Sequence, residues 1–202
     1  LHDDDLIAEL VTQHGPEMHT RGRSASVRRW LDQLSPTRLH SDPTLCLMAA
    51  ITAVGLGEEE DARAWVRVGM DACGPSTGDG AESSPSLEFL TLNSLMSLGP
   101  VRASLVDAER AYDRLPSGIW HAAACQAVGV HSRALGRDDV AASRFAEGAA
   151  EARITEAPTV HAECRAQLAV MSGERGDWSE ATIVAREARQ LLRDHQLENM
   201  PH

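Results

Sequence analysis

A glycine followed at fixed distances by small or apolar residues recurs along this chain of 202 residues. Successive copies of the glycine are 35, 42, 37 and 40 residues apart. The five glycines are Gly22, Gly57, Gly99, Gly136 and Gly176. A repeat of about forty residues predicts stacked helical hairpins, because one hairpin cannot bury its apolar face alone and needs a neighbour.

The spacing within one repeat has a direct physical meaning. We expect the glycine to close the first helix of the hairpin, where a left-handed conformation favours glycine. Acidic residues such as Asp138 and Asp139 then begin the second helix, where the helix dipole stabilises them. Positions five, nine and twelve after Gly136 are Ala141, Phe145 and Gly148, which fall on one helical face. Small residues on that face let the two helices of the hairpin lie close together.

The apolar spacing predicts ten helices, and no stretch alternates apolar and polar residues long enough to indicate a strand. Proline lies near the start of several of them, where a helix tolerates it. The expected helices are residues 4–14, 24–34, 43–55, 58–72, 85–98, 102–115, 117–135, 138–153, 158–173 and 179–195. The expected fold class is therefore all-α, a superhelix of four to five helix-turn-helix hairpins.

The expected organisation is one helical-repeat domain over residues 1–202, excised from a longer chain because it begins with Leu1. Residues 74–86 are rich in Gly, Ser and Pro, and we expect a flexible loop between repeats there. A lid over a functional site is the alternative for that loop. The pair Gly15-Pro16 is expected to fall in the hinge of the first hairpin.

Composition excludes several kinds of chemistry. All 19 basic residues are arginine, so no Schiff-base lysine and no lysine of a phosphate-binding loop is present in the sequence. The net charge of −11 argues against contact with nucleic acid, which requires clustered cations. The sequence contains no run of 18 apolar residues, which a membrane-spanning helix would need. A cytoplasmic location is therefore expected. The scattered Cys46, Cys73, Cys125 and Cys164 are expected to be reduced, mostly buried thiols.

The repeat resembles the tetratricopeptide pattern, and Gly129, Gly136, Ala141 and Phe145 match it best. A narrower resemblance covers residues 21–68 and concerns the helical-repeat region of large ATP-dependent LuxR-type regulators, the MalT-like group. The matching residues are Arg21, Arg23, Val27, Trp30, Leu31, Asp32, Leu34, Pro36, Asp42, Pro43, Leu45, Gly57, Ala62 and Trp65.

This resemblance implies a longer parent protein with a nucleotide-binding module before the repeats and a DNA-binding helix-turn-helix domain after them. ATP would bind only in that preceding module, and no cofactor is expected in this segment. The repeats would sense a small-molecule inducer or a protein partner and would contact the other domains of the parent. The alternative is a stand-alone scaffold that binds a partner's peptide or helix.

No catalytic or metal site is expected. No serine lies in a G-x-S-x-G turn, and the contiguous acidic residues 58–61 are typical of a solvated helix start. Among the histidines of the first helices, His161 with Glu163 and Cys164 comes nearest to a metal-ligand spacing, and packing of a partly buried histidine is the alternative.

A binding groove is the better candidate, since the first helices of tetratricopeptide-like hairpins line the concave surface. Alignment of the repeats places polar side chains and one aromatic ring there, although each could equally be a solvated surface residue. The expected groove residues are Phe89, Asn93, Gln126, Arg133 and Glu163. The tryptophans Trp30, Trp65, Trp120 and Trp178 are expected to pack in the core or between repeats.

Overall fold

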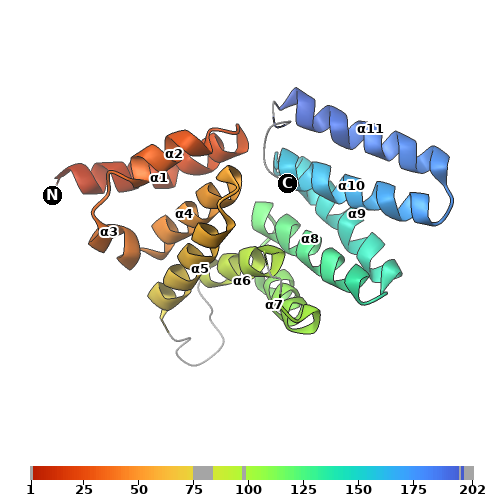
Figure 1. The fold of residues 1–202 in the computed structure, drawn as a ribbon, viewed down its shortest axis with the longest axis horizontal. Coiled ribbons are helices and arrows are strands. Elements are labelled where there is room, and N and C mark those ends of the chain that lie inside the picture. The colour runs from red at the N-terminus through yellow and green to blue at the C-terminus, as the bar shows by residue number, and fades with distance from the viewer. Residues whose placement is uncertain (1, 75–83, 97–98, 196, 198–202) are drawn as a thin grey trace. The chain divides into compact units, whose positions relative to one another are not determined.

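The computed structural model describes residues 2–74, 84–96, 99–195 and 197, and its regular structure there is entirely α-helical (Figure 1). Most helices pack against the next helix of the same unit in antiparallel order, as a helical-repeat fold requires. The eleven helices of the described residues are α1 (His2–Thr20), α2 (Ser24–Leu31), α3 (Pro36–Ser41), α4 (Pro43–Leu56), α5 (Glu59–Cys73), α6 (Ser84–Met96), α7 (Val101–Arg114), α8 (Ile119–Ala134), α9 (Asp138–Ile154), α10 (Pro158–Glu174) and α11 (Trp178–Asp194). The all-α prediction is confirmed.

Two local features differ from the sequence-based expectation. Helix α1 runs through Gly15 and Pro16 without a hinge. Gly15 packs against Met48 of α4 so closely that an added Cβ would lie 2.7 Å from the Met48 Cε, so this part of α1 lies against the core. The second difference is α3, a short helix that begins at Pro36 after Ser35 caps it by accepting from the Arg38 amide.

The helices group into two compact units, one containing α1 to α6 and the other α7 to α11. Residues 75–83, most of the loop expected at 74–86, lie outside the described residues, whereas residues 84–86 already belong to α6. None of the helices in the described part of the chain is long and apolar enough to cross a membrane.

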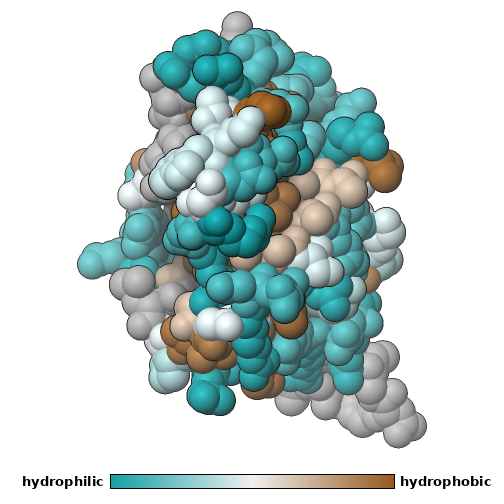
Figure 2. All heavy atoms as spheres, turned by 90° about the vertical axis from the view of Figure 1, so that its right-hand side faces the viewer, coloured by the Kyte–Doolittle hydropathy of each residue, from teal (hydrophilic) through white to brown (hydrophobic). Residues whose placement is uncertain are grey.

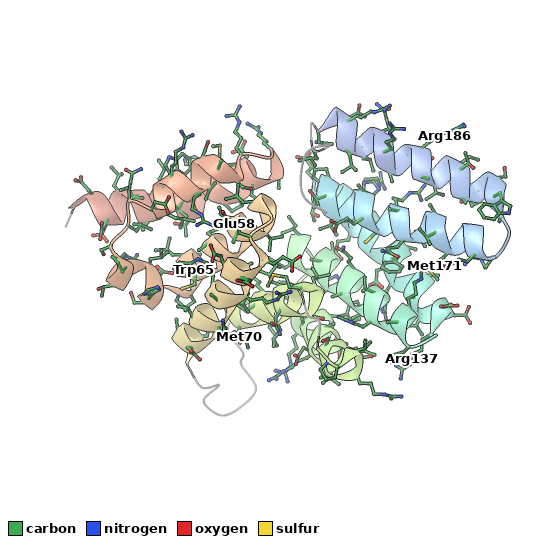
Figure 3. All side chains as sticks on the ribbon, viewed as in Figure 1. Glu58, Trp65, Met70, Arg137, Met171 and Arg186 are labelled. Carbon is green, nitrogen blue, oxygen red and sulfur yellow. The ribbon has the colours of Figure 1, made fainter. Side chains whose placement is uncertain are left out.

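Helix α4 forms the centre of the first unit. It is apolar on all sides, and residues 45–50 are all buried against neighbouring helices. Asp42 caps its start by accepting from the Thr44 amide at 2.9 Å, and Gly57 closes its end in the left-handed conformation, with φ of 76°. Trp65 on α5 packs, partly buried, against this core (Figure 3).

The second unit follows the predicted repeat closely. Ala141 and Phe145 of α9 are fully buried, and Gly148 is buried beside them. With Met171 of α10 they fill the space between consecutive hairpins (Figure 3). The predicted spacing fails only on α11, where Ala185 is exposed, because the side of α11 that packs on α10 carries Val184 and Ala188 instead.

Candidate functional site

Three of the predicted groove residues take part in hydrogen bonds between α8 and α10, the two first helices of their hairpins in the second unit. Gln126 of α8 donates from Nε2 to the Glu163 carboxylate of α10 at 2.6 Å. Arg133 of α8 donates to Gln167 at 2.7 Å and also to Glu174 at the end of α10. These side chains form a polar row across α8 and α10, in which each named group already has a partner within the protein.

The other two predicted residues belong to α6 in the first unit. Phe89 is fully buried, and a Cβ added at Gly69 of α5 would lie only 2.0 Å from the Cζ of its ring. The ring therefore fills the contact between α5 and α6 and lies inside the core instead of on an open groove. Asn93 is half-buried on the same helix, and its contact with a ligand stays a prediction.

A hollow of about 540 Å³ lies on the other side of α10, between α9 and α11. Small and aliphatic side chains form much of its lining, and charged side chains from all three helices complete it. The aliphatic lining consists of Ala146, Ala149, Ala150, Leu168 and Leu191. The polar lining consists of Arg153, His161, Arg165, Glu187, Gln190 and Asp194. The sequence reading missed this hollow because it forms between second helices of successive hairpins.

The histidine of the hollow is held neutral by its surroundings. Burial lowers the pKa of His161, and the nearby guanidinium groups of Arg165 and Arg153 lower it further. Arg165 itself pairs with Glu187 across the hollow. A neutral imidazole beside two guanidinium groups can donate one hydrogen bond and accept another.

The group His161, Glu163 and Cys164, which came nearest to a metal site in the sequence, is divided by the helix. His161 lines the hollow, Glu163 pairs with Gln126 of α8, and Cys164 is fully buried in the core between α9 and α10. Glu163 lies on the opposite side of α10 from His161, and Cys164 is enclosed in the core, so the three side chains do not converge.

A shallower apolar depression lies along α10 and α11. Trp178 is 71% exposed there, although the sequence predicted that it packs in the core. Val170 is also about half-exposed beside it. Figure 2 shows mostly hydrophilic surface on the side of the molecule that faces right in Figure 1, interrupted by a smaller apolar region.

The start of α8 is held by a carboxylate from α9. Glu151 accepts from the Gly118 amide at 2.6 Å and from the Ser117 hydroxyl at 2.7 Å through one oxygen, and pairs with the His121 ring through the other. Burial opposes the charge of Glu151, but the hydrogen bonds from Ser117, His121 and Gly118 outweigh burial and lower its pKa. A glutamate 33 residues away therefore caps a helix whose own N-cap residue, Gly118, has no side chain for the task.

Cys125 completes this cluster and was overlooked in the sequence. It lies four residues after His121, at the spacing that places both side chains on one helical face. Its sulfur is 3.9 Å from His121 Nδ1. Burial raises the pKa of the Cys125 thiol to about 12, with the Glu147 and Glu151 carboxylates adding to the effect. The spacing of His121 and Cys125 was readable from the sequence, whereas the approach of Glu151 depends on the packing of α9.

Fold and geometry together define an all-α protein of sequentially packed helical hairpins. Comparison of the sequence with protein-family models and curated proteins, and of the structure with solved structures, gives no match.

Proposed function

We propose that this chain is a binding module built from helical repeats, with a sensing and not a catalytic role, and that its ligand occupies the hollow between α9, α10 and α11. The observation that carries the proposal is the hollow itself. Its volume of about 540 Å³ and its aliphatic lining beside a few polar groups are typical of sites for small ligands or peptide segments.

The polar groups indicate which ligand chemistry would fit. Arg153, Arg165 and the neutral His161 form one part of the lining, and the aliphatic side chains of α9 and α11 form another. Guanidinium groups bind carboxylates through paired hydrogen bonds. The preferred ligand is therefore an organic acid with an apolar body, or a peptide segment with one acidic and several apolar side chains.

The polar row of α8 and α10 supports a second binding surface for the same role. Gln126 pairs with Glu163 there, and Arg133, further along α8, pairs with Gln167. Because their hydrogen bonds are already satisfied within the protein, a ligand on this face must displace them. In the hollow Arg165 is already paired with Glu187, but the exposed Arg153 could receive a ligand without the loss of that pair, and we therefore favour the hollow.

The resemblance of residues 21–68 to LuxR-type, MalT-like regulators supports a more specific role. In that role the module senses an inducer or partner in the cytoplasm for a regulator whose other domains bind nucleotide and DNA. The alternative is a stand-alone scaffold for a partner protein. The coding sequence on both sides of this segment distinguishes the two hypotheses. The regulator requires a nucleotide-binding module before the repeats and a helix-turn-helix domain after them. If both are absent, the regulator hypothesis is wrong.

The binding proposal is tested with a library of apolar carboxylic acids and short acidic peptides. Ligands are identified by thermal shift of the full chain and confirmed by calorimetry. Ala150→Trp fills the hollow and Arg153→Ala removes its exposed guanidinium, so both should weaken binding at least tenfold. Ala103→Trp, at an exposed position of α7, is the matched control and should bind normally.

The outcomes separate the two surfaces. If Arg133→Ala loses binding while Ala150→Trp binds as tightly as the parent, the ligand site is the polar row and not the hollow. If no compound of either class binds, or if every ligand binds Ala150→Trp and Arg153→Ala as tightly as the parent, the hollow is not the functional site.

A further inference from the structure

Three potential metal ligands from two helices converge at the start of α8. They are Nδ1 of His121, Sγ of Cys125 and a carboxylate oxygen of Glu151, and all lie within 4.8 Å of one another. In a tetrahedral zinc site the ligand atoms lie about 2.0–2.3 Å from the ion, hence roughly 3.4 Å from one another. Side-chain rotations that move the ligand atoms by about 1 Å would therefore bring all three within bonding distance of one ion.

The surroundings hold two of the three ligands, Glu151 and His121, in place. One oxygen of Glu151 is anchored by the Gly118 amide and the Ser117 hydroxyl, which leaves the other oxygen directed at His121. The Tyr112 ring lies against the His121 ring, with centroids 4.9 Å apart. Hydrogen bonds that hold metal ligands in place are a regular feature of protein metal sites.

A further layer holds Tyr112 in position. Its hydroxyl donates to Glu147 at 3.0 Å and accepts from Arg144 at 2.8 Å, and the Arg144 guanidinium lies 4.2 Å from the centroid of its ring. The residues behind the cluster thus come from α7 and α9, both packed on α8. The site is part of a rigid contact between three helices and not of a loop.

We propose that His121, Cys125 and Glu151 bind a divalent transition-metal ion, with Zn²⁺ the best match to this set. One imidazole nitrogen, one thiolate sulfur and one carboxylate oxygen are ligands that zinc accepts together, whereas Mg²⁺ and Ca²⁺ prefer oxygen alone. The side chains of His121 and Glu151 remain 17% and 13% exposed, which gives the ion a route in and leaves a fourth position for water.

Binding changes the protonation of two ligands. The Cys125 thiol releases its proton to solvent as the sulfur binds the ion, and the imidazole carries its remaining proton on Nε2 so that Nδ1 can bind. Thiolate and carboxylate then balance the two positive charges of the ion. The hydrogen bond between His121 and Glu151 is replaced by a bond from each to the metal, so the ion connects α8 to α9.

The test is titration of the metal-free full chain with Co²⁺, which reports thiolate ligation by a charge-transfer absorption in the near ultraviolet. We expect this absorption to saturate at one equivalent and to be abolished by added Zn²⁺. Cys125→Ala should remove it, whereas Cys164→Ala, at the other buried cysteine of the second unit, should retain it. Circular dichroism verifies that both variants fold.

Glu151→Gln provides a second, nearly isosteric variant. Its amide oxygen can still accept from Gly118 and Ser117, but it is a poor metal ligand, so the affinity for Co²⁺ should fall at least tenfold with the fold retained. The proposal is overturned if the parent chain shows no cobalt–thiolate absorption in tenfold excess of Co²⁺. It is equally overturned if the absorption survives in Cys125→Ala or is lost in the folded control Cys164→Ala.

Discussion

Replacement of Gly129 by alanine should separate the effect of tight helix contact from the effect of helix propensity. Gly129 lies on α8 directly under the Phe145 ring of α9, and an added Cβ would lie 2.6 Å from Cε1, 2.8 Å from Cδ1 and 2.9 Å from Cζ. Carbon atoms in contact are normally about 3.5–4.0 Å apart. The ring would therefore have to move by about 1 Å.

The structure leaves little room for that movement. Phe145 is fully buried and packs with Ala141, Ala149 and Met171. Overpacking of a filled core costs about 1–3 kcal/mol, and Phe145 belongs at the upper end of that range because its neighbours enclose it. Alanine in place of glycine within a helix gains about 1 kcal/mol. Gly129→Ala should thus lower the free energy of unfolding by about 1–2 kcal/mol.

Gly173→Ala is the matched control because it makes the same substitution where space exists. A Cβ there would lie 3.4 Å from Trp178 Cζ3 and 3.7 Å from Ala181, which are ordinary contacts. It should raise the free energy of unfolding by up to about 1 kcal/mol. Urea denaturation of both variants, followed by circular dichroism, measures the two signs.

A smaller side chain at position 145 should relieve the clash. Gly129→Ala combined with Phe145→Leu should be less destabilised than the sum of the two single variants, because the branched side chain leaves room for the new methyl group. If Gly129→Ala is stabilised like Gly173→Ala, or if the double variant shows simple additivity, the ring does not lie over Gly129 and the packing described for α8 and α9 is wrong.

Three further predictions concern single positions. Thr52 carries a buried hydroxyl with no hydrogen-bond partner among the described residues, so Thr52→Val should raise the free energy of unfolding by about 1 kcal/mol in urea titrations, and a decrease would contradict this. Burial lowers the pKa of His19 from 6.5 to about 4, so the unfolded chain takes up the proton first and stability is lost as pH falls from 6.5 to 4. The melting temperature of His19→Gln should fall less than that of the parent between pH 6.5 and 4. An equal fall in both would show that other groups cause the loss of stability. Ala141→Leu should cost about 1–3 kcal/mol by the same denaturation assay, since Ala141 is fully buried in the repeat contact, and an unchanged midpoint would contradict the repeat alignment.

Local signals in the sequence predicted the hairpins well. Gly57, Gly136 and Gly176 end their turns at φ of 76°, 71° and 85°, the left-handed conformation expected from their position after a helix. These ends could be predicted because they depend on neighbouring residues only. The continuation of α1 through Pro16 was not predicted, and the packing of Gly15 against Met48 joins residues far apart in the chain, which local signals do not report.

The candidate sites were predicted less well, for a related reason. The sequence placed Gln126, Arg133 and Glu163 on first helices but did not show that they hydrogen-bond across α8 and α10. It also treated Phe89 as a groove residue, because it did not show that Gly69 opens a space in α5 for the ring. Pairings between helices depend on their rotation and spacing, which the repeat pattern alone does not specify.

Helix α9 shows how one composition gives both tight packing and empty space. On the side toward α8, Gly148 lets the helices approach so closely that an added Cβ would lie 3.0 Å from that of Cys125. On the side toward α11, Ala146 and Ala150 are exposed and line the hollow. Larger side chains at these two positions would fill that volume, as Ala150→Trp is designed to do. Small residues on opposite sides of α9 thus have different effects: Gly148 permits close packing on α8, and Ala146 and Ala150 leave open the hollow that we propose as the binding site.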